Sequence, residues 1–532
     1  MTTIAGAAID GRGRLAAFWG GCLMVATGVL LHIPMFLACA DMGYQMAGMP
    51  TDPGMVLGMA LIVAGAVLSG WSLLPKNDSA VHLAPTLIVE TDEAVRLNRR
   101  HLMLMAVLTL ALVIDTMKPA TLGFVTPGVA REYGLTKAVA ALLPFTALTG
   151  TVIGSLVWGV LADLFGRRAS ILLAAIMFVG TAICGAMPSF AWNLVMCFLM
   201  GASAGGLMPI AYTLLAETIP ARHRGWVLVL VGGLGLVGGY LAASTCSSLL
   251  IGHFGWRILW FLGLPTGVLL VTLNRFIPES PRFLILQGRQ AEAAAVLQRL
   301  GSKVRVSSSA PPTSAQGAAR APVAAAGLWR VTLALTVTGL AWGLINFGLL
   351  LWLPGDLVAK GYSAATASGL LARSAFVALP TVALAALLYS RWSSKGALVA
   401  MLLITAAGLG AVLGLETGAG RGLLANPVLA IALLIVGSNG VIAVLLPYSA
   451  ENYPLAMRGR GSGWIAGASK AGGLVAQGLS LAALVPALGL AAWMMAAPVA
   501  AAAVLVLLFG RETRGRALGD AGSVPGGALE TL

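Results

Sequence analysis

Residues 159–168 read Gly159-Val160-Leu161-Ala162-Asp163-Leu164-Phe165-Gly166-Arg167-Arg168 and lie between apolar runs at about 139–161 and 169–187. Each run is long enough to span a bilayer, which takes about 20 mostly apolar residues. Gly166 suits a tight turn between helices, and the paired arginines suit a turn on the cytoplasmic side of a membrane. The stretch therefore predicts two antiparallel membrane helices joined by a short basic turn.

The whole chain has the composition of a membrane protein. Of its 532 residues, 58% are hydrophobic and 10% are charged, against about 25% charged in a soluble domain. Fourteen apolar runs have spanning length, and each is predicted to be a helix because backbone amides in lipid need partners within their own segment. The runs cover about 15–39, 54–75, 102–126, 139–161, 169–187, 191–216, 226–250, 257–277, 331–353, 365–390, 396–415, 427–447, 462–485 and 488–510. The predicted fold class is an all-α polytopic membrane protein.

The basic residues predict the orientation of the chain. With a cytoplasmic N-terminus, alternate loops place 25 of the 33 Lys and Arg in the cytoplasm and 5 outside, and leave Lys118, Arg373 and Lys470 inside helices. Because Lys and Arg favour cytoplasmic loops, both termini are predicted to be cytoplasmic. The abundance of Arg, Ala and Gly is typical of a GC-rich bacterial genome, so we expect the inner (plasma) membrane. The net charge of +14 resides in these loops, and no nucleic-acid partner is predicted.

An internal repeat divides the last twelve spans into two sets of six. Ala216-Glu217-Thr218-Ile219-Pro220 with Arg224 reappears 234 residues later as Ala450-Glu451-Asn452-Tyr453-Pro454 with Arg458, and Glu279 and Glu512 lie 233 residues apart. The predicted parts are an extra transmembrane hairpin with its connector (1–101), a six-helix bundle (102–277), a cytoplasmic linker (278–330), a second six-helix bundle (331–510) and a cytoplasmic tail (511–532). Two parallel repeats are a known transporter plan, with the substrate near the midplane between them.

The stretch at 159–168 closely resembles a loop of the major facilitator superfamily. Within that superfamily the chain is similar to the sugar-porter-like branch and its organic-acid relatives, which include aromatic acid:proton symporters. This likeness rests on Glu217-x-x-Pro220-x-x-x-Arg224, Gly255-Trp256-Arg257, Pro278-Glu279-Ser280-Pro281-Arg282, Glu451-x-x-Pro454-x-x-x-Arg458 and Arg511-Glu512-Thr513-Arg514-Gly515, and it covers about 102–516. Two departures are Cys197, where the family usually has arginine, and Lys118, where its acid symporters have a second acid.

The resemblance implies a cytoplasmic network that locks the inward side while the carrier faces outward. Its predicted members are Gly159, Asp163, Gly166, Arg167, Arg168, Glu217, Arg224, Glu279, Arg282, Glu451, Arg458 and Glu512. Gly159 is expected to let two helix backbones approach closely, and Asp163 to face a neighbouring helix N-terminus. Arg167 is expected to pair with an acid such as Glu217. A static role at helix ends is the alternative for these residues.

Asp115 and Lys118 carry the most informative chemistry in the chain. Asp115 lies about 20 Å along a helix that starts near Leu102, which places it near the membrane midplane. A charge at that depth costs at least about 2.5 kcal/mol, so it is expected to face a cavity or a partner. We interpret Lys118 as helping to bind an anion and Asp115 as carrying or gating a proton. The alternative is an Asp115–Lys118 ion pair that only stabilises the bundle.

Two further bases are predicted inside helices. Lys470 lies about 13 Å into the eleventh core helix, and Arg373 lies a similar distance into the eighth. Snorkelling to the outer interface is the alternative for Arg373. Together with Asp115 and Lys118 these residues give a cavity excess of about two positive charges, which favours a carboxylate substrate. Asn346, Asn439 and Gln477 are further polar candidates, although helix–helix hydrogen bonds are the more common role of such residues.

The sequence thus predicts a secondary active transporter of a small organic anion, coupled to protons and working by alternating access. A neutral-sugar or drug carrier is one alternative, and a non-transporting membrane sensor is another. Neither an enzyme, a metal site nor a cofactor is predicted, because the five histidines are scattered and no phosphate-binding GxxxxGK[ST] loop is present. The expected partners are the substrate, protons and the lipid bilayer.

Overall fold

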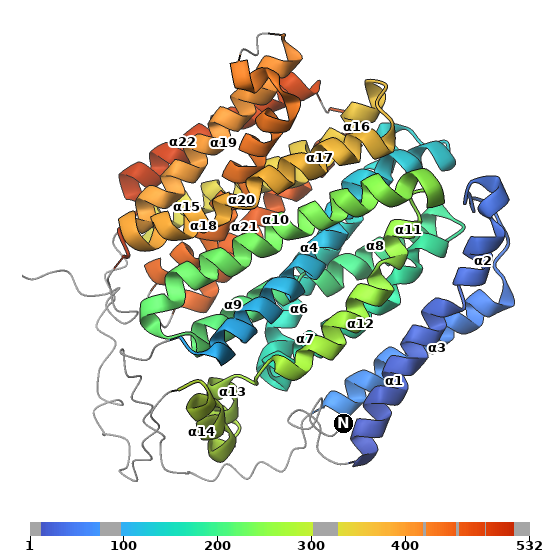
Figure 1. Ribbon diagram of the computed structural model, residues 1–532, viewed down its shortest axis with the longest axis horizontal. Coiled ribbons are helices and arrows are strands. Elements are labelled where there is room, and N and C mark those ends of the chain that lie inside the picture. Colours follow the sequence, from blue (N-terminus) through green and yellow to red (C-terminus); the bar gives the residue numbers. More distant parts are fainter. Residues whose placement is uncertain are drawn as a thin grey trace, which may run out of the picture.

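The computed structural model describes residues 12–74, 97–301, 328–418, 422–453, 457–484 and 486–514. These residues are mostly helical and include no strand, and long helices lie side by side along the molecule (Figure 1). Thirteen described segments are long and apolar enough to cross a membrane. The structure therefore confirms the predicted all-α polytopic membrane fold. Below, the motif end is the end of the molecule that holds the turn at Gly166.

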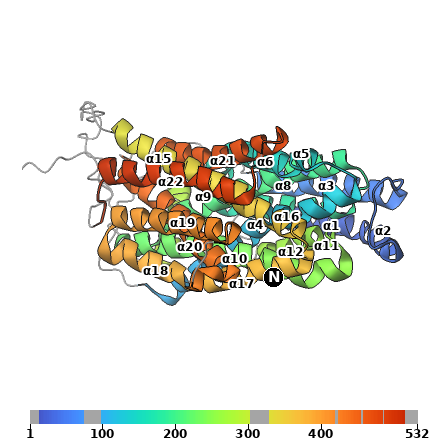
Figure 2. The same ribbon diagram turned by 90° about the horizontal axis from the view of Figure 1, so that it is seen from above.

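The extra N-terminal hairpin forms as predicted. Its elements are α1 (Arg12–Leu30), α2 (Ile33–Ala38), η1 (Ala40–Met42) and α3 (Pro53–Leu73). Glycines let its two long helices touch, because a Cβ on Gly21 would lie only 2.6 Å from the Gly65 carbonyl oxygen. The hairpin packs on α7, on the side of the first bundle that faces away from the second (Figure 2).

The first bundle contains six spans. Its elements are α4 (Arg99–Glu132), α5 (Lys137–Ala140), α6 (Leu142–Phe165), α7 (Arg167–Gly180), η2 (Thr181–Ala186), α8 (Phe190–Ala204), α9 (Leu207–Thr218), α10 (Ala221–Phe254), α11 (Ile258–Phe261), α12 (Gly263–Leu273) and η3 (Asn274–Phe276). Helix α6 approaches α8 at Gly150 and Gly154, where added Cβ atoms would lie 2.1 Å and 2.2 Å from carbonyl oxygens of α8.

The predicted linker begins with two short helices beyond the end of the bundle, α13 (Pro281–Leu286) and α14 (Gln290–Arg299) (Figure 1). The Ser280 hydroxyl caps α13 by accepting a hydrogen bond from the Phe283 N–H at 3.0 Å. Arg289, the residue before α14, pairs with Glu292 in the first turn of that helix at 2.7 Å. The Ser- and Pro-containing stretch at 307–312 and the connector at 76–96 lie outside the described residues.

The second bundle also contains six long helical segments. Its elements are α15 (Leu328–Leu344), η5 (Ile345–Leu349), α16 (Leu350–Ala359), α17 (Ala364–Ala378), α18 (Thr381–Leu387), η6 (Leu388–Trp392), α19 (Ser394–Glu416), η7 (Gly422–Ala425), α20 (Pro427–Asn452), α21 (Arg458–Leu481) and α22 (Leu488–Phe509). Helix α21 corresponds to the predicted span at 462–485, the thirteenth in chain order. Its 24 residues form a helix, but Arg, Lys, Gly and Ser make it less apolar than the thirteen others.

The two bundles meet along several helix pairs. Helix α10 packs against α17, α18 and α20, while α4 packs against α16 and α6 packs against α21. Seen from above, the second bundle and the hairpin lie on opposite sides of the first bundle (Figure 2). Polar residues on α4, α10 and α21 therefore lie on helices that form the interface between the bundles.

Candidate functional site

Asp115 and Lys470 interact across the interface between the bundles. Asp115 lies on α4 and is 8% exposed. The positive charge that acts most strongly on its carboxylate is Lys470, on α21 of the other bundle, followed by Lys118. Asp115 is in turn the opposite charge that acts on Lys470. One acid and one base, one from each bundle, are thus near enough to act on each other electrostatically, although the described ion pairs do not include them.

Lys118 is held inside the first bundle. Its side chain is buried, and Nζ donates hydrogen bonds to the Phe178 carbonyl oxygen at 2.5 Å and to Thr181 Oγ1 at 2.8 Å. The same ammonium lies 3.8 Å from the centre of the Phe178 ring. A Cβ on Gly263 would lie 2.8 Å from Nζ, so the glycine makes room for it. In this structure Lys118 thus contacts α7 and η2, and among the described ion pairs none joins it to Asp115.

Arg373 lies on a different surface from Asp115. It is exposed on α17, on a helical face that also carries Phe376 and Val377, which are 68% and 44% exposed. Large exposed apolar side chains on a membrane helix mark the face toward lipid. This position matches the snorkelling alternative for Arg373, and it reduces the predicted excess of positive charge around Asp115 from about two to about one.

Sequence reasoning missed a set of aromatic side chains within the bundles. The Tyr240 hydroxyl and the indole N–H groups of Trp342 and Trp352 are buried without a hydrogen-bond partner among the described residues. Tyr240 lies 6.0 Å from Phe124, and Trp342 lies edge-on to Phe347 at 5.5 Å, measured between ring centres. A buried Tyr or Trp usually finds a partner for its polar atom. Their presence in apolar runs was the signal available in the sequence.

The three additional polar candidates have different positions. Gln477 on α21 donates a hydrogen bond to the Phe347 carbonyl oxygen, so it joins two helices. Asn346 lies in η5, a single π-helical turn, and such turns are frequent at functional sites. Asn439 lines a cavity of about 10 Å³ between α10, α18 and α20, which is at most large enough for one water molecule.

At the motif end, Glu279 caps the N-terminus of α7. Its carboxylate accepts hydrogen bonds from the backbone N–H groups of Arg167 at 2.7 Å and Arg168 at 3.3 Å. Negative charge is favoured at this end of a helix. Burial raises the pKa of Glu279, and the backbone donors, including Ser280, offset part of that rise. Gly166 has a φ of +93°, and a Cβ there would lie 2.6 Å from Glu279 Oε2.

The Arg167 side chain links α6 to α9. Its guanidinium lies 3.3 Å from Asp163 and 3.6 Å from Glu217, and it also donates to the Ala162 carbonyl oxygen at 3.2 Å. Glu217 accepts a further hydrogen bond from the Ser280 hydroxyl. Residues from three separate elements therefore converge beside the turn.

The second half repeats this arrangement with different donors. Glu512 accepts hydrogen bonds from the Ser394 N–H at 3.0 Å and from the Ser393 hydroxyl, and so caps α19. Burial acts to raise the pKa of Glu512, but the hydrogen bonds from Ser393 and Ser394 outweigh it and lower the pKa to about 2. Thr513 donates to Glu451 at 2.6 Å, as Ser280 does to Glu217 one repeat earlier. The two halves of the chain therefore share equivalent hydrogen bonds at these acids as well as a repeated sequence.

The predicted role of Gly159 in the network is wrong. Gly159 is exposed, and a Cβ there would meet no atom within 4 Å. The close approach of α6 occurs at Gly150 and Gly154 instead, and Gly159 lies five residues, or about 140° of helical rotation, from the face that carries Gly154. The Asp163 side chain is 76% exposed and contacts Arg167 on the adjoining turn. Because Arg167 is the first residue of α7, the Asp163 carboxylate lies beside the start of the next helix, while Glu279 accepts the backbone N–H groups there.

The other network residues are spread over both bundles. Arg224 donates to the Ile219 carbonyl oxygen at 3.4 Å, and its charge also acts on Glu451 across the interface. The Tyr389 hydroxyl donates to Glu451 at 2.6 Å. Arg282 is exposed on α13. Arg458 begins α21, but its side chain lies outside the described part of the chain.

At the opposite end, a buried ion pair ties the extra hairpin to the first bundle. Glu132 and Arg257 lie 2.7 Å apart, with side chains that are 4% and 0% exposed. Glu132 also accepts hydrogen bonds from the backbone N–H groups of Met46 at 2.7 Å and Ala47 at 3.0 Å. The predicted topology places Arg257 among the five outer basic residues. Its acid partner was not predicted, since Glu132 lies 125 residues away along the chain.

Comparison with known proteins places the chain in a family. The model of the Major Facilitator Superfamily matches residues 102–477. The niacin transporter NiaP of Acinetobacter baylyi is 28% identical over 444 residues, which cover 82% of this chain and 99% of that protein. The gallate transporter of Pseudomonas putida is 33% identical over 276 residues, 49% of this chain and 60% of the relative. The 4-hydroxybenzoate transporter PcaK of Acinetobacter baylyi is 33% identical over 198 residues, 37% of this chain and 43% of the relative.

Solved structures show the same fold. The xylose transporter XylE from E. coli, in a partially occluded inward open conformation, has a TM-score of 0.62 at 18% sequence identity, and the match covers 79% of this chain and 100% of XylE. The first hundred residues, with the hairpin, precede the segment that matches the family model. The chain therefore belongs to the major facilitator superfamily, and it is a membrane transporter rather than an enzyme.

Proposed function

We propose that this transporter carries a small aromatic carboxylate together with a proton, by alternating access between its two bundles. The observation that carries the proposal is the pair formed by Asp115 and Lys470, opposite charges on facing bundles. Ionisable residues within membrane spans mark substrate and proton pathways, because their burial in lipid is costly. Repeat-built transporters bind substrate near the midplane between the repeats.

Lys470 is the proposed contact for the substrate carboxylate, and Asp115 is the proposed proton site. The Asp115 carboxylate and a substrate carboxylate compete for the same ammonium group. A proton on Asp115 removes this competition and leaves Lys470 available to the substrate. Proton and substrate therefore strengthen each other's binding, and by linkage the effect is equal in both directions. Lys118 adds positive charge nearby while its own ammonium is bound to Phe178 and Thr181.

The aromatic part of the substrate is inferred from two sources. Niacin, 4-hydroxybenzoate and gallate, the compounds named for the relatives, are each an aromatic ring with one carboxyl group. In this chain, Tyr240, Trp342 and Phe347 lie on elements of both bundles, and the first two have polar atoms that lack a described partner. Aromatic side chains favour edge-on and offset contacts with another ring, and their polar atoms suit ring substituents.

The motif-end network is the proposed conformational lock. Arg167, Glu217 and Glu279 join helix ends within the first bundle, and Glu451 with Glu512 does so in the second. Each bundle can then move as a rigid unit, with the Arg224–Glu451 interaction made and broken between them. We assign the motif end to the cytoplasm of a bacterial inner membrane, with both termini on that side, because most loop arginines and lysines lie there.

A binding experiment tests the assignment of substrate. Purified protein in detergent is titrated with aromatic carboxylates, matched aliphatic carboxylates and neutral sugars, and binding is followed by calorimetry. We expect an aromatic carboxylate to bind, and Lys470→Gln to weaken this binding at least about tenfold, as loss of a charge-assisted contact does. Arg373→Gln on the lipid-facing surface is the matched control and should bind within about twofold of the native protein. Binding of sugars without carboxylates would contradict the proposal, and binding without any transport would identify a sensor.

A further inference from the structure

An open cavity of about 620 Å³ lies at the motif end, apart from the Asp115–Lys470 pair. Its lining comes from the first turns of α4, the end of η3 and the helices α13 and α14. One part of its lining is basic and another part is apolar. The basic part includes Arg100, Arg275 and Arg299, and the apolar part includes Met103, Leu104 and Phe276.

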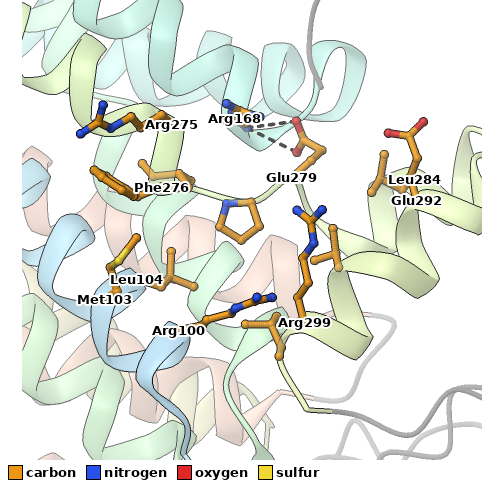
Figure 3. Close-up of a pocket in the computed structure, with 14 residues that line it drawn as sticks. Arg100, Met103, Leu104, Arg168, Arg275, Phe276, Glu279, Leu284, Glu292 and Arg299 are labelled. Atoms are coloured by element: carbon orange, nitrogen blue, oxygen red, sulfur yellow. Dashed lines mark hydrogen bonds between the residues drawn. The ribbon is translucent and has the colours of Figure 1, made fainter. Parts of the chain in front are cut away.

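The positive charge of this cavity is not balanced by its own acids. Glu279 is engaged with the N-terminus of α7, and Glu292 is paired with Arg289 at 2.7 Å. Arg100 and Arg299 reach into the cavity from α4 and α14, whereas Arg275 lies at its edge (Figure 3). Among the described residues, no carboxylate lies within ion-pair distance of these three arginines.

The cavity lies where two membrane spans meet the water-facing part of the protein. One span begins at Arg99, one residue before Arg100, and another ends at Phe276. Beside the cavity, Leu102 and Met103 are 55% and 42% exposed on the first turn of α4. Exposed apolar side chains at the start of a span contact the acyl region next to the headgroups. The cavity therefore has guanidinium groups at headgroup depth and an apolar wall that continues toward lipid.

We propose that this cavity binds the phosphate headgroup of an anionic phospholipid from the adjoining leaflet. Arg100 and Arg299 hold the phosphate oxygens, because a guanidinium group matches phosphate in geometry and charge. Met103, Leu104 and Phe276 provide the wall along which the glycerol and the first acyl carbons lie. Basic pockets next to membrane helices are the usual binding sites of anionic headgroups. The bound lipid joins α14 to the first turn of α4.

Native mass spectrometry of the full chain tests this site, with phosphatidylglycerol, phosphatidylcholine and soluble glycerol 3-phosphate as probes. We expect the native protein to retain phosphatidylglycerol in preference to phosphatidylcholine. The variant Arg100→Gln/Arg299→Gln should bind phosphatidylglycerol about thirtyfold more weakly, because each base near an anionic headgroup contributes about a factor of five. Arg222→Gln removes an exposed base on α10 at the same end and should stay within about twofold of the native protein.

A second variant separates binding from folding. Arg100→Lys/Arg299→Lys keeps both charges and should retain phosphatidylglycerol within about fivefold of the native affinity. The unfolding temperature of every variant in phosphatidylcholine shows whether the fold is intact. The proposal is overturned if the glutamine variant binds phosphatidylglycerol like the native protein, or if the lysine variant loses as much affinity as the glutamine variant. It is also overturned if glycerol 3-phosphate binds as tightly as the lipid, since the ligand would then be a soluble phosphate.

Discussion

Gly166 is constrained in two independent ways. Its φ of +93° is a backbone conformation that side chains with a Cβ rarely adopt, and the Glu279 carboxylate occupies the space where a Cβ would lie. The first constraint was predictable from the sequence, because a glycine between two spans indicates a tight turn. The second was not, because Glu279 lies more than a hundred residues away along the chain.

Replacing Gly166 with alanine should destabilise the protein by about 1–3 kcal/mol, the usual cost of a strained backbone position, with a further loss from the contact with Glu279. Thermal unfolding in detergent measures this effect. Gly159→Ala is the control, because Gly159 is exposed, lies inside α6 and has no atom near its Cβ position. Alanine there should leave stability unchanged or raise it by up to about 1 kcal/mol. Equal losses at the two positions would refute the explanation.

Glu512 predicts a pH dependence of stability. Its pKa is lowered from an ordinary value of 4.5 to about 2, because hydrogen bonds from Ser393 and Ser394 outweigh the effect of burial. The ionised carboxylate therefore stabilises the fold above about pH 4.5, and this contribution is lost as the pH falls toward 2. At pH 7, Glu512→Gln should lower stability by about 2 kcal/mol, and the difference from the native protein should shrink between pH 5 and pH 3. A difference that is constant over this range would contradict the assignment.

At the scale of elements, Glu132 fastens the hairpin loop to the first bundle, together with a backbone hydrogen bond from the Gly48 N–H to the Pro188 carbonyl oxygen at 3.0 Å. Glu132 at the end of α4 pairs with the fully buried Arg257. Its carboxylate also accepts hydrogen bonds from the backbone N–H groups of Met46 and Ala47 in the hairpin loop. A buried base that loses its acid partner is strongly destabilising, because the remaining charge is uncompensated. The hairpin is thus joined to the first bundle by polar bonds at one end and by helix packing on α7 along its length.

Glu132→Gln should lower stability by about 3–5 kcal/mol, which is typical for breaking a buried ion pair. It should also expose the loop at 43–52 to a protease added from the side of that loop. Thermal unfolding and limited proteolysis measure the two effects. Asp41→Asn is the control, because Asp41 is exposed in η1, directly before that loop. The stability of this variant should stay within about 0.5 kcal/mol of the native protein. Native-like resistance to the protease in Glu132→Gln would rule out the proposed fastening.

The sequence predicted elements better than it predicted the faces of those elements. Apolar runs identified the spans because lipid forces long, self-satisfied helices. Lys118 and Arg373 were assigned to a cavity, yet Lys118 contacts α7 and η2 and Arg373 lies on an exposed apolar face. Helices such as α4 and α17 are apolar on most sides, so residue spacing does not indicate which side faces lipid. Partners such as Phe178 of Lys118 are set by tertiary packing alone.

Over the whole molecule, two similar bundles carry equivalent capped helix ends at the motif end and an acid–base pair between them. The internal repeat at an offset of 233–234 residues predicted that the acids Glu217 and Glu451, and Glu279 and Glu512, would occupy equivalent positions. The hydrogen bonds to Ser280 and Thr513 show that they do. The residues proposed to bind proton and substrate do not follow the repeat. Asp115 lies on the first span of its bundle and Lys470 on the fifth span of the other.

Transport in liposomes tests the central claim, the coupling of a proton on Asp115 to a carboxylate on Lys470. Native protein and Asp115→Asn are reconstituted, and the uptake of labelled 4-hydroxybenzoate is measured first with an inward proton gradient and then as exchange without a gradient. The native protein should accumulate the label in the first experiment and exchange it in the second. Asp115→Asn should still exchange the label but accumulate at least about tenfold less. Accumulation by Asp115→Asn equal to that of the native protein would contradict the account.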